Sequence, residues 1–534
     1  MKKFHLSRFA MVWPLFVQLL SSSSAESQTA SLQRVPNYVG SVVCSASEFI
    51  TANTVEDIQT AVRKALDTKL SLKVRSIAKS RSYSPAICPE EGGIVLNVEP
   101  LKEILSIDSE RRTVSVQPGV RIGDLQAKLS DANLAFPVTP DYNGVSIAGA
   151  MGAGAHNSSL QIPTAVGDWV EEIKLVDGKG EIQVLSGERL NAARVHLGLL
   201  GIIFELKLKV VPQFKLERRS VKMSDSLLAA EGIPMARQYA YAKLHWFPMQ
   251  KTFIMEALKQ VPLSTPGNSY NNSWTTPAIA GVLKNFSLPI DVLNSNKALQ
   301  CAVEAVRVKT WASSYAAVDS PSENPVGLSQ NMIGGSCAEG TCAWDRGIKS
   351  RTIEAAFAAK DFPAWVEDVK ELINRRPGCF PLLGIYLRFS APSSSYIGQA
   401  AGQETVMFEI HMPQTQRPTL ESSSEVYDEI IQLTLGKYQG RPHWGKNTQP
   451  YFNQLGSEQF PKWEDFKALQ ATLDPQGVFE NSFWKAIGAR QISPATANCG
   501  VTRQCFCSQD SDCGTNAQCE SGVLFTEAKI CVKR

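Results

Sequence analysis

The chain has few histidines and almost no excess of either charge. Its 534 residues include 6 histidines, and 54 basic residues stand against 51 acidic ones, which leaves a formal net charge of +3. No long run of one sign occurs. This balance argues against nucleic acid as the main partner, because phosphate backbones select strongly basic surfaces.

Long apolar runs are missing after the first 25 residues. That opening segment has a basic start at Lys2, Lys3 and Arg8, an apolar core from Phe9 to Leu20, and small residues up to Ala25. The pattern is typical of a secretory signal, and the core is too short to span a bilayer comfortably. We expect residues 1–25 to be a signal peptide and the mature protein to be soluble and without a membrane span. Its destination would lie on the secretory pathway, in the extracellular space or apoplast or in a vacuole.

Internal repeats of solenoid length are also absent, and the remaining pattern indicates α+β domains. Helical spacing of apolar residues predicts helices, and alternation predicts strands. We predict a first domain over 38–235, a second over 236–495 and a tail over 496–534. The predicted helices are 54–69, 122–129, 353–359, 362–374, 424–435 and 463–473. The predicted strands are 73–77, 94–98, 104–107, 113–117, 170–176, 181–185, 202–211, 239–248, 251–258, 382–389 and 406–412. We expect hairpins at 104–117 and 170–185 and a cap of the first helix by Thr54 with Asp57. We also expect Asn481 to cap or turn the last helix and Trp444 to pack in the core.

Cysteine usage agrees with export. The chain has 12 cysteines, and 6 of them lie in the last 36 residues. Such density after a signal sequence indicates a disulfide-stapled tail, although its connectivity is not readable. Zinc is the alternative, but the tail has no histidine and no Cys-x-x-Cys pair. Cys337 and Cys342 could close a small loop, and the sequons at Asn271 and Asn285 indicate glycosylation, whereas the sequon at Asn157 is expected to be buried.

The stretch from Gly144 to Ser159, GVSIAGAMGAGAHNSS, has four glycines, four alanines and no charged residue. Glycine permits positive backbone angles, and clustered backbone amides suit the phosphates of a nucleotide. The G-x-G-x-x-G spacing of a Rossmann fold is lacking. Taken alone, such a stretch is more typical of a loop or tight turn than of a cofactor site.

Three further segments change that interpretation. They are NAARVHLGLLGII (191–203), RPHWGK (441–446) and DPQGVFEN (474–481). In this order and at these separations, the set resembles the FAD-linked aldonolactone oxidoreductases of the vanillyl-alcohol-oxidase superfamily, in the form of the plant L-gulonolactone oxidase family with its cysteine-rich tail. The resemblance covers roughly residues 40–490, and the hexapeptide at 441–446 is its most specific part.

The resemblance implies a two-lobed FAD-binding domain, an α+β cap over the flavin, and a small disulfide-rich tail. It also implies oxidation of an aldonolactone, L-gulono-1,4-lactone, by dioxygen, which forms hydrogen peroxide and a 2-keto-lactone that tautomerises to L-ascorbate. The residues it assigns to FAD are Ser80, Arg81, Ser82, Tyr83, Ser84, Gly144, Gly149, Gly152, Gly154, Ala155, His156, Asn157, Gly198, Gly201, His443 and Lys446.

Lys446, Arg388, His443 and Glu409 are the candidates for catalysis. A cation beside the flavin would stabilise the negative charge that develops there during reduction. A surface lysine is the usual alternative for Lys446, and an ion pair is the usual alternative for Arg388. No metal site is expected.

The chain departs from the family pattern at two positions. Arg81 stands where relatives with covalent flavin carry the linking histidine, so the resemblance implies non-covalent FAD. Tyr386 stands where several relatives have glutamate, and tyrosine is a poor base unless its pKa is lowered. Glu409, on a neighbouring predicted strand, is the candidate to compensate.

Two alternatives remain open. The chain could oxidise another sugar, sugar acid or alditol on the same fold. It could also be a weakly catalytic flavin-binding protein that contacts the cell wall through its tail, although a purely structural tail is the simpler interpretation.

Overall fold

The computed structural model describes residues 32–76, 80–270, 290–309, 311, 324–335, 350–413, 420–453, 455–489 and 497–534. The predicted signal peptide, the sequons at Asn271 and Asn285, and Cys337 and Cys342 lie outside these residues. Residues 1–31 and 32–534 are separate units, and the description concerns the second unit alone. In the described part of the chain, no helix has both the length and the apolar character that crossing a membrane requires.

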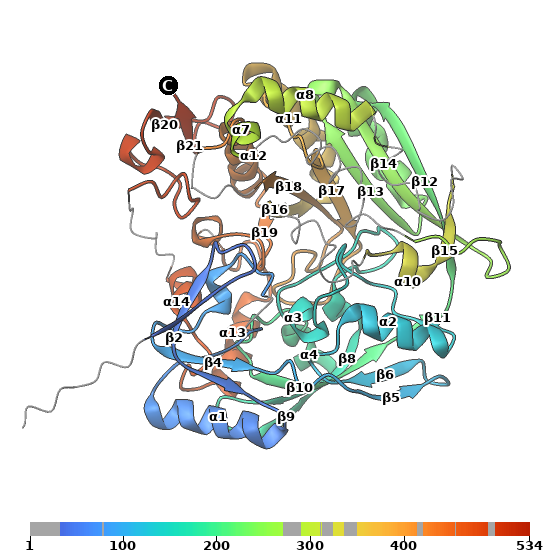
Figure 1. Cartoon of the computed structure of the whole chain (residues 1–534), viewed down its shortest axis with the longest axis vertical. Coiled ribbons are helices and arrows are strands. Elements are labelled where there is room, and N and C mark those ends of the chain that lie inside the picture. The colour runs from blue at the N-terminus through green and yellow to red at the C-terminus, as the bar shows by residue number, and fades with distance from the viewer. Residues whose placement is uncertain are drawn as a thin grey trace, which may run out of the picture. The chain divides into compact units, whose positions relative to one another are not determined.

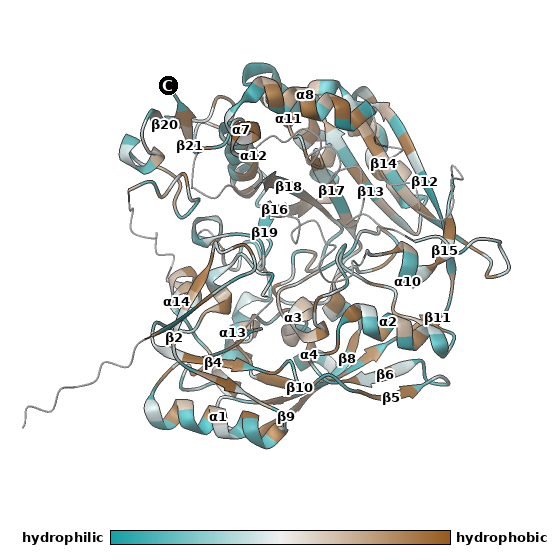
Figure 2. Cartoon of the chain, in the orientation of Figure 1, coloured by the Kyte–Doolittle hydropathy of each residue, from teal (hydrophilic) through white to brown (hydrophobic). Residues whose placement is uncertain are grey.

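The first element of the fold is a four-stranded sheet covered by a helix (Figure 1). The helix begins with the expected capping box, in which Asp57 N donates to Thr54 Oγ1 at 3.1 Å and Thr54 N donates to Asp57 Oδ2 at 2.9 Å. Apolar and polar residues alternate around the helix (Figure 2), and its apolar side packs on the sheet. The sheet order is β1-β2-β4-β3, and the bounds are β1 Gln33–Pro36, β2 Val43–Thr51, α1 Val55–Thr68, β3 Leu72–Val74 and β4 Gly93–Asn97.

A five-stranded antiparallel sheet follows, in the order β5-β6-β10-β8-β9. Both hairpins expected from the sequence, β5–β6 and β8–β9, are present. The short helix α3 carries part of the Gly/Ala stretch. The bounds are β5 Ile104–Asp108, β6 Thr113–Val116, α2 Ile122–Asp131, β7 Leu134–Ala135, α3 Ile147–Gly152, β8 Val170–Val176, β9 Ile182–Leu185, α4 Gly187–Ala193, β10 Ile202–Lys209 and β11 Val211–Pro212.

The third sheet has eight antiparallel strands in the order β15-β12-β14-β13-β17-β18-β16-β19. Its first strand in the chain, β12, precedes residue 236, where the second domain was predicted to start. The bounds of its elements are β12 Lys215–Ser224, α5 Leu228–Arg237, β13 Tyr241–Phe247, β14 Thr252–Val261, α7 Ile290–Ser295, α8 Lys297–Lys309, β15 Val326–Leu328, α10 Ser329–Met332, β16 Ser350–Ala358, α11 Phe362–Arg375, β17 Ile385–Ser390, β18 Thr405–Pro413, α12 Ser424–Lys437 and β19 Arg441–Pro442.

One predicted helix is wrong. Residues 353–359 lie almost entirely in strand β16, which pairs with β18 on one side and β19 on the other. The segment is rich in alanine and contains glutamate, which favour a helix in isolation. Burial between two strands overrides that preference, and a short apolar run does not distinguish a helix from a buried strand by periodicity alone.

The C-terminal helices return to the N-terminal lobe. Helix α13 (Trp463–Leu473) and helix α14 (Ser482–Gly488) flank a turn whose Val478 O accepts from Leu72 N at 2.8 Å. Asn481 caps α14 by accepting from Trp484 N at 3.0 Å, as the sequence suggested. The lobe is therefore completed by residues that lie some 400 positions after its first strands.

The tail is folded around three disulfides, Cys499–Cys505, Cys507–Cys519 and Cys513–Cys531. It has a hairpin of β20 (Ala517–Ser521) and β21 (Lys529–Lys533) that packs on α12. The buried carboxylate of Glu429 accepts from Val523 N, Leu524 N and Phe525 N at 3.0, 2.7 and 3.0 Å. Two further disulfides, Cys44–Cys88 and Cys301–Cys379, staple the body of the chain.

Candidate active site

Four segments that are far apart in the sequence meet in the fold. The loop 80–84 contacts the hexapeptide 441–446, since Tyr83 N donates to Gly445 O at 2.7 Å. A Cβ added to Gly445 would lie 3.3 Å from Cβ of Ala153, which places the hexapeptide on the Gly/Ala stretch. The turn 196–201 joins the same group through Leu197 N, which donates to Gly152 O at 3.0 Å. The segments that the resemblance assigned to FAD thus form one region.

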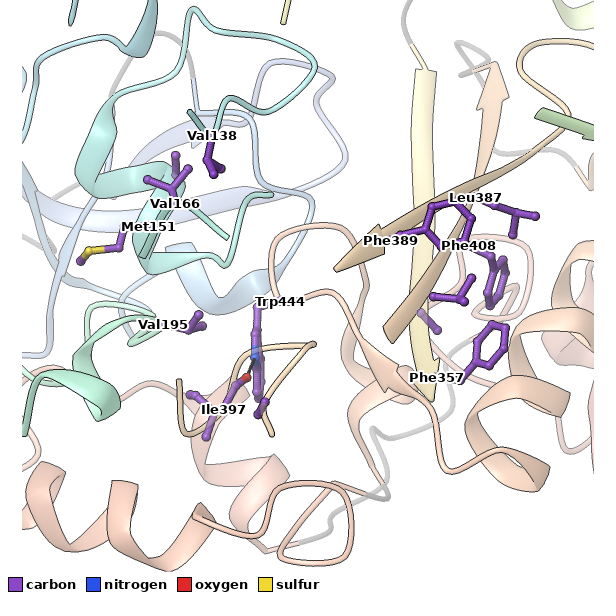
Figure 3. Close-up of a cluster of buried hydrophobic side chains, with 14 of the residues drawn as sticks. Val138, Met151, Val166, Val195, Phe357, Leu387, Phe389, Ile397, Phe408 and Trp444 are labelled. Carbon is purple, nitrogen blue, oxygen red and sulfur yellow. Dashed lines mark hydrogen bonds between the residues drawn. The ribbon is translucent and has the colours of Figure 1, made fainter. Parts of the chain in front are cut away.

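Trp444 locks the hexapeptide into the core between the lobe and the eight-stranded sheet. Its side chain is 1% exposed, and its Nε1 donates to Ile397 O at 2.7 Å (Figure 3). The same apolar cluster contains Met151 from the Gly/Ala stretch and Phe408 from the sheet. Trp444 is therefore a packing residue, as expected, and it positions Gly445 and Lys446.

The glycines of the site divide into two kinds. Several are closely approached by the protein's own side chains: a Cβ on Gly144 would collide with the ring of Tyr142, and one on Gly149 would lie 2.9 Å from Ser146 Oγ. A Cβ on Gly201 would lie 2.6 Å from Leu175 Cδ1 and 2.7 Å from Val176 O, so its close approach is to β8. Gly198, by contrast, has φ +66° and open space where a Cβ would be.

The turn around Gly198 also fits a bound cofactor. The adjacent His196 is buried, and its Nε2 has no hydrogen-bond partner among the described residues. Its Nδ1 accepts from Gly198 N at 2.9 Å, so only Nε2 is left for a ligand. Burial lowers the pKa of His196 to about 4, which keeps the ring neutral. His196 Nε2 is thus a buried polar atom without a partner among the described residues, and it lies against Gly152 of the charge-free stretch. Such an atom is suited to a bound group with its own hydrogen-bonding atoms.

The loop 80–84 is held by serine hydroxyls and by a backbone hydrogen bond. Ser82 Oγ donates to Gly445 O at 3.1 Å, Ser84 Oγ accepts from Ala86 N at 3.2 Å, and Ser80 O accepts from Tyr38 N at 3.0 Å. The guanidinium of Arg81 lies 4.4 Å from the ring centre of Tyr38 and 4.6 Å from that of Tyr142. Arg81 therefore lies between two aromatic rings where covalent relatives have a histidine.

The catalytic candidates form one buried ionic cluster on the eight-stranded sheet. Glu354 on β16, Glu409 on β18 and Tyr386 on β17 stand in register on neighbouring strands and share a face. Lys446 Nζ lies 2.6 Å from Glu354 Oε2 and 2.8 Å from Glu409 Oε2. Arg388 Nη2 pairs with both carboxylates as well, at 2.5 Å for Glu409 Oε2.

The charges of this cluster hold one another in the ionised state. Although burial raises the pKa of Glu409, Lys446 and Arg388 lower it to about 2. Burial opposes ionisation of Glu354 too, but the same two cations hold its pKa well below the ordinary value. Burial alone would lower the pKa of Arg388, yet the carboxylates raise it. Lys446 and Arg388 therefore each contact the same two buried carboxylates, which is the ion pairing named above as the alternative for Arg388.

Two histidines connect the cluster to the cofactor loops. His156 Nδ1 lies 2.8 Å from Asn157 O, and its Nε2 lies 2.8 Å from Glu354 Oε1. His443 Nδ1 accepts from Gly445 N at 2.9 Å, and burial lowers its pKa to about 3. His156, Glu354 and His443 have potential metal-ligand atoms within 4.8 Å of one another. Arg388 and Lys446 at the same carboxylate would repel a metal ion, so this geometry does not favour a metal centre.

Sequence reasoning missed Glu354, Asp141 and Lys243. Glu354 was hidden because its strand was predicted as a helix. Tyr386 OH donates to Asp141 Oδ2 at 2.8 Å, and Lys243 Nζ pairs with Asp141 Oδ1. Asp141 stands three residues before the Gly/Ala stretch, outside every motif, and its partners come from β13 and β17. No local signal marked it.

Comparison with solved structures defines the class. The crystal structure of cholesterol oxidase from B. sterolicum matches with a TM-score of 0.67 at 15% identity, over 85% of this chain and 96% of that chain. A variant of Physcomitrella patens BBE-like 1 matches with a TM-score of 0.56 at 13% identity, over 84% and 96%. A family model of an FAD binding domain matches residues 46–186. The fold is the two-domain α+β architecture of FAD-binding oxidoreductases, as the resemblance implied.

Sequence comparison defines the family. The model of D-arabinono-1,4-lactone oxidase matches residues 206–487, and that of the L-gulonolactone oxidase 2-like C-terminal domain matches residues 496–533. Probable L-gulonolactone oxidase 6 of Arabidopsis thaliana is 27% identical over 92% of this chain and 87% of its own length. L-gulono-1,4-lactone dehydrogenase of Mycobacterium tuberculosis is 26% identical over 84% and 98%. Because the oxidase model spans more than half of the chain, the protein belongs to the D-arabinono-1,4-lactone oxidase family, with the tail of the plant L-gulonolactone oxidases.

Proposed function

We propose that the protein oxidises L-gulono-1,4-lactone with dioxygen, forming hydrogen peroxide and the 2-keto-lactone that tautomerises to L-ascorbate. FAD, when bound, supplies the acceptor for the two electrons removed from the substrate. The names of the relatives support the choice of an aldonolactone. Lys446 and Arg388 would hold positive charge where the substrate meets the cofactor, and Glu354 would orient them.

The observation that carries the proposal is the contact between the cluster and the cofactor loops. His156 of the Gly/Ala stretch reaches Glu354, and Gly445 beside Lys446 lies on Ala153. A substrate at this junction would face charged side chains from the sheet and a backbone surface without charge from the lobe. That separation suits a polar substrate beside a flat, mostly apolar ring.

FAD would be bound non-covalently, because Arg81 stands where the resemblance implies a linking histidine. Arginine cannot make the histidyl bond, and Tyr38 and Tyr142 hold its guanidinium at 4.4 and 4.6 Å from their ring centres. The purified protein is expected to be yellow and to release its flavin on acid precipitation. Flavin that remained with the precipitated protein would contradict this attachment.

A peroxide-release screen tests the substrate. The purified holoenzyme is offered L-gulono-1,4-lactone, L-galactono-1,4-lactone and simple alditols, and peroxide is expected from the gulonolactone. Peroxide from alditols alone would support the second candidate, an oxidase of another sugar or polyol, for which the Tyr386 departure is the motivating observation. A correctly folded but colourless protein would contradict both.

We propose export through the secretory pathway. The basic and apolar opening of the chain supports this, and so do the five disulfides among the described residues, because such bonds persist in oxidising compartments. The protein with a fluorescent fusion at its C-terminus should be found outside the cytosol by microscopy. The same fusion without residues 1–25 should stay in the cytosol. Contact of the tail with the cell wall is a second part of this proposal. The tail itself is bound to α12, where Gln432 Nε2 donates to Lys529 O and Glu429 Oε1 accepts from Leu524 N.

A further inference from the structure

Asp141 connects the cofactor loop to the sheet that carries the ionic cluster. It lies three residues before Gly144, and its backbone O accepts from Gly335 N at 2.8 Å. Its carboxylate accepts from Tyr386 OH at 2.8 Å, pairs with Lys243 Nζ, and lies 4.0 Å from Arg388 Nη1. The side chain therefore belongs to the same charge network as Glu354 and Glu409, but it comes from the opposite lobe.

Exposure separates Asp141 from the other two carboxylates. Its side chain is 23% exposed, whereas Glu354 and Glu409 are 0% and 4% exposed. Both glutamates are enclosed by Arg388 and Lys446. Of the three carboxylates, Asp141 has the largest exposed fraction.

Tyr386 stands where the resemblance implies a glutamate in several relatives, and both Tyr386 and Glu409 are engaged by other groups of this chain. Burial and the charge of Asp141 raise the pKa of Tyr386 well above the ordinary value, so the phenol stays protonated and donates. Glu409 is occupied by Arg388, Lys446 and His411, the last at 3.1 Å. The tyrosine instead directs its hydroxyl to a carboxylate from another segment.

We propose that Asp141 is a substrate-binding residue, whose carboxylate accepts hydrogen bonds from hydroxyl groups of the aldonolactone in place of the family glutamate. The proposal rests on the proposed function and names a residue that recognises its substrate. Tyr386 is then a positioning residue, since it acts through Asp141. Lys243 and Arg388 keep Asp141 ionised and therefore limited to accepting hydrogen bonds.

The charge of Asp141 adds a statement about substrate class. Its carboxylate pairs with Lys243 and lies 4.0 Å from Arg388 Nη1. A carboxylate that meets the substrate repels a second carboxylate, so Asp141 favours an uncharged hydroxylated ring, the lactone, over the open-chain aldonate anion.

Substrate binding to Asp141→Asn tests this directly. The holoenzyme is first reduced with dithionite under argon, so that it cannot turn over, and is then titrated calorimetrically with L-gulono-1,4-lactone and with L-gulonate. Because a hydrogen bond to a charged group is lost, the Kd for the lactone should rise roughly 10- to 100-fold. Because one negative charge is removed beside Lys243 and Arg388, the Kd for L-gulonate should fall roughly 3- to 10-fold.

Asp368→Asn is a matched control outside the site. Asp368, on α11, also accepts from a lysine and a tyrosine, Lys437 Nζ and Tyr438 OH, both at 2.5 Å, and its side chain is 20% exposed. The Asp368→Asn variant should bind both ligands with the wild-type Kd values. If the two Kd values rise equally in Asp141→Asn, or if neither changes, the role of Asp141 is overturned.

A second variant keeps the test decisive if Asp141→Asn does not fold. Tyr386→Phe removes the hydroxyl that orients Asp141 but leaves its charge, so lactone binding should weaken roughly 3- to 10-fold while L-gulonate binding stays unchanged. Unchanged lactone binding would overturn the proposal. If the wild-type protein neither binds L-gulono-1,4-lactone nor releases peroxide with it, the proposed function is overturned as well. This outcome distinguishes the failure of the proposed function from the failure of the role of Asp141.

Discussion

The Gly/Ala stretch and the ionic cluster face each other at the junction of the two domains, and they are built in opposite ways. The stretch at 144–159 is continuous in sequence and carries no charge, and its shape comes from small residues and backbone hydrogen bonds. The cluster is discontinuous in sequence and consists of charged side chains. They are Glu354, Arg388, Glu409 and Lys446, which belong to four separate segments. A surface for a bound cofactor can be built largely from one continuous segment. The ionic cluster forms only when the strands of the eight-stranded sheet have paired.

The difference also separates their energetics. Some backbone groups in the stretch bond neighbours a few residues away, such as Ala155 N, which donates to Ala150 O at 2.8 Å. Others bond distant segments, such as Ser159 N, which donates to Phe389 O at 2.9 Å, but none of these bonds involves a charge. Each charge in the cluster depends on a partner from another strand, and loss of one partner leaves the others buried and uncompensated. The cluster should therefore be far more sensitive to single substitutions than the stretch.

The largest effect is expected for Arg388→Met, which breaks the cluster. Glu354 and Glu409 would lose a shared cation, and removal of one partner from a buried ion network costs about 3–5 kcal/mol of unfolding free energy. Urea unfolding of the purified variants measures it. Arg237→Met is the control, because its pair with Glu404 at 2.8 and 2.9 Å is on the surface and should cost at most about 1 kcal/mol. Equal losses in the two variants would contradict the difference between buried and exposed pairs.

Lys446→Ala tests the function of the cluster rather than its stability. Loss of a positioned cation should slow flavin reduction by L-gulono-1,4-lactone roughly 100- to 1,000-fold. Stopped-flow absorbance under anaerobic conditions measures the rate, and the melting temperature reports folding. Lys437→Ala, which removes a half-exposed lysine paired with Asp368, should reduce at the wild-type rate. Wild-type kinetics in Lys446→Ala would remove Lys446 from the site.

The cluster also predicts a pH dependence that the stretch lacks. The folded-state pKa of Glu409 is lowered to about 2, so its stabilisation is fully present above the unfolded pKa and is lost as the pH falls toward 2. The contribution is at most about 3 kcal/mol near neutral pH. The difference in urea unfolding free energy between wild type and Glu409→Gln should therefore be constant from pH 8 to about pH 5 and shrink below about pH 4. A constant difference down to pH 3 would contradict the shifted pKa.

The smallest effects are expected for alanine substitutions at Gly201 and Gly198, two glycines that lie beside the Gly/Ala stretch. Gly201→Ala places a Cβ 2.6 Å from Leu175 Cδ1 and should lower the unfolding free energy by roughly 1–3 kcal/mol, with or without flavin. Gly198→Ala meets open space but puts an alanine at φ +66°, so it should lower apoprotein stability by roughly 1–2 kcal/mol and should also reduce the flavin content of the purified protein. Full flavin content in Gly198→Ala would exclude close contact between that turn and the cofactor.

The sequence predicted the elements whose signals are local. The capping box of α1, both hairpins of the five-stranded sheet, the cap at Asn481 and the burial of Asn157 and Trp444 are confirmed. It failed at β16, where an alanine-rich segment with helical preference lies between two strands. That error concealed Glu354, the carboxylate that contacts His156, Arg388 and Lys446.

The sequence by itself determined the family, the α+β fold class and the cysteine-rich tail, because motifs, periodicity and cysteine density are properties of neighbouring residues. It also placed Arg388, Glu409, His443 and Lys446 as candidates for one site. Only the tertiary structure decided which carboxylates meet those cations. The pairing of β16, β17 and β18 joins residues tens of positions apart, and Asp141 reaches Tyr386 across 245 positions. No local pattern marks contacts at either separation.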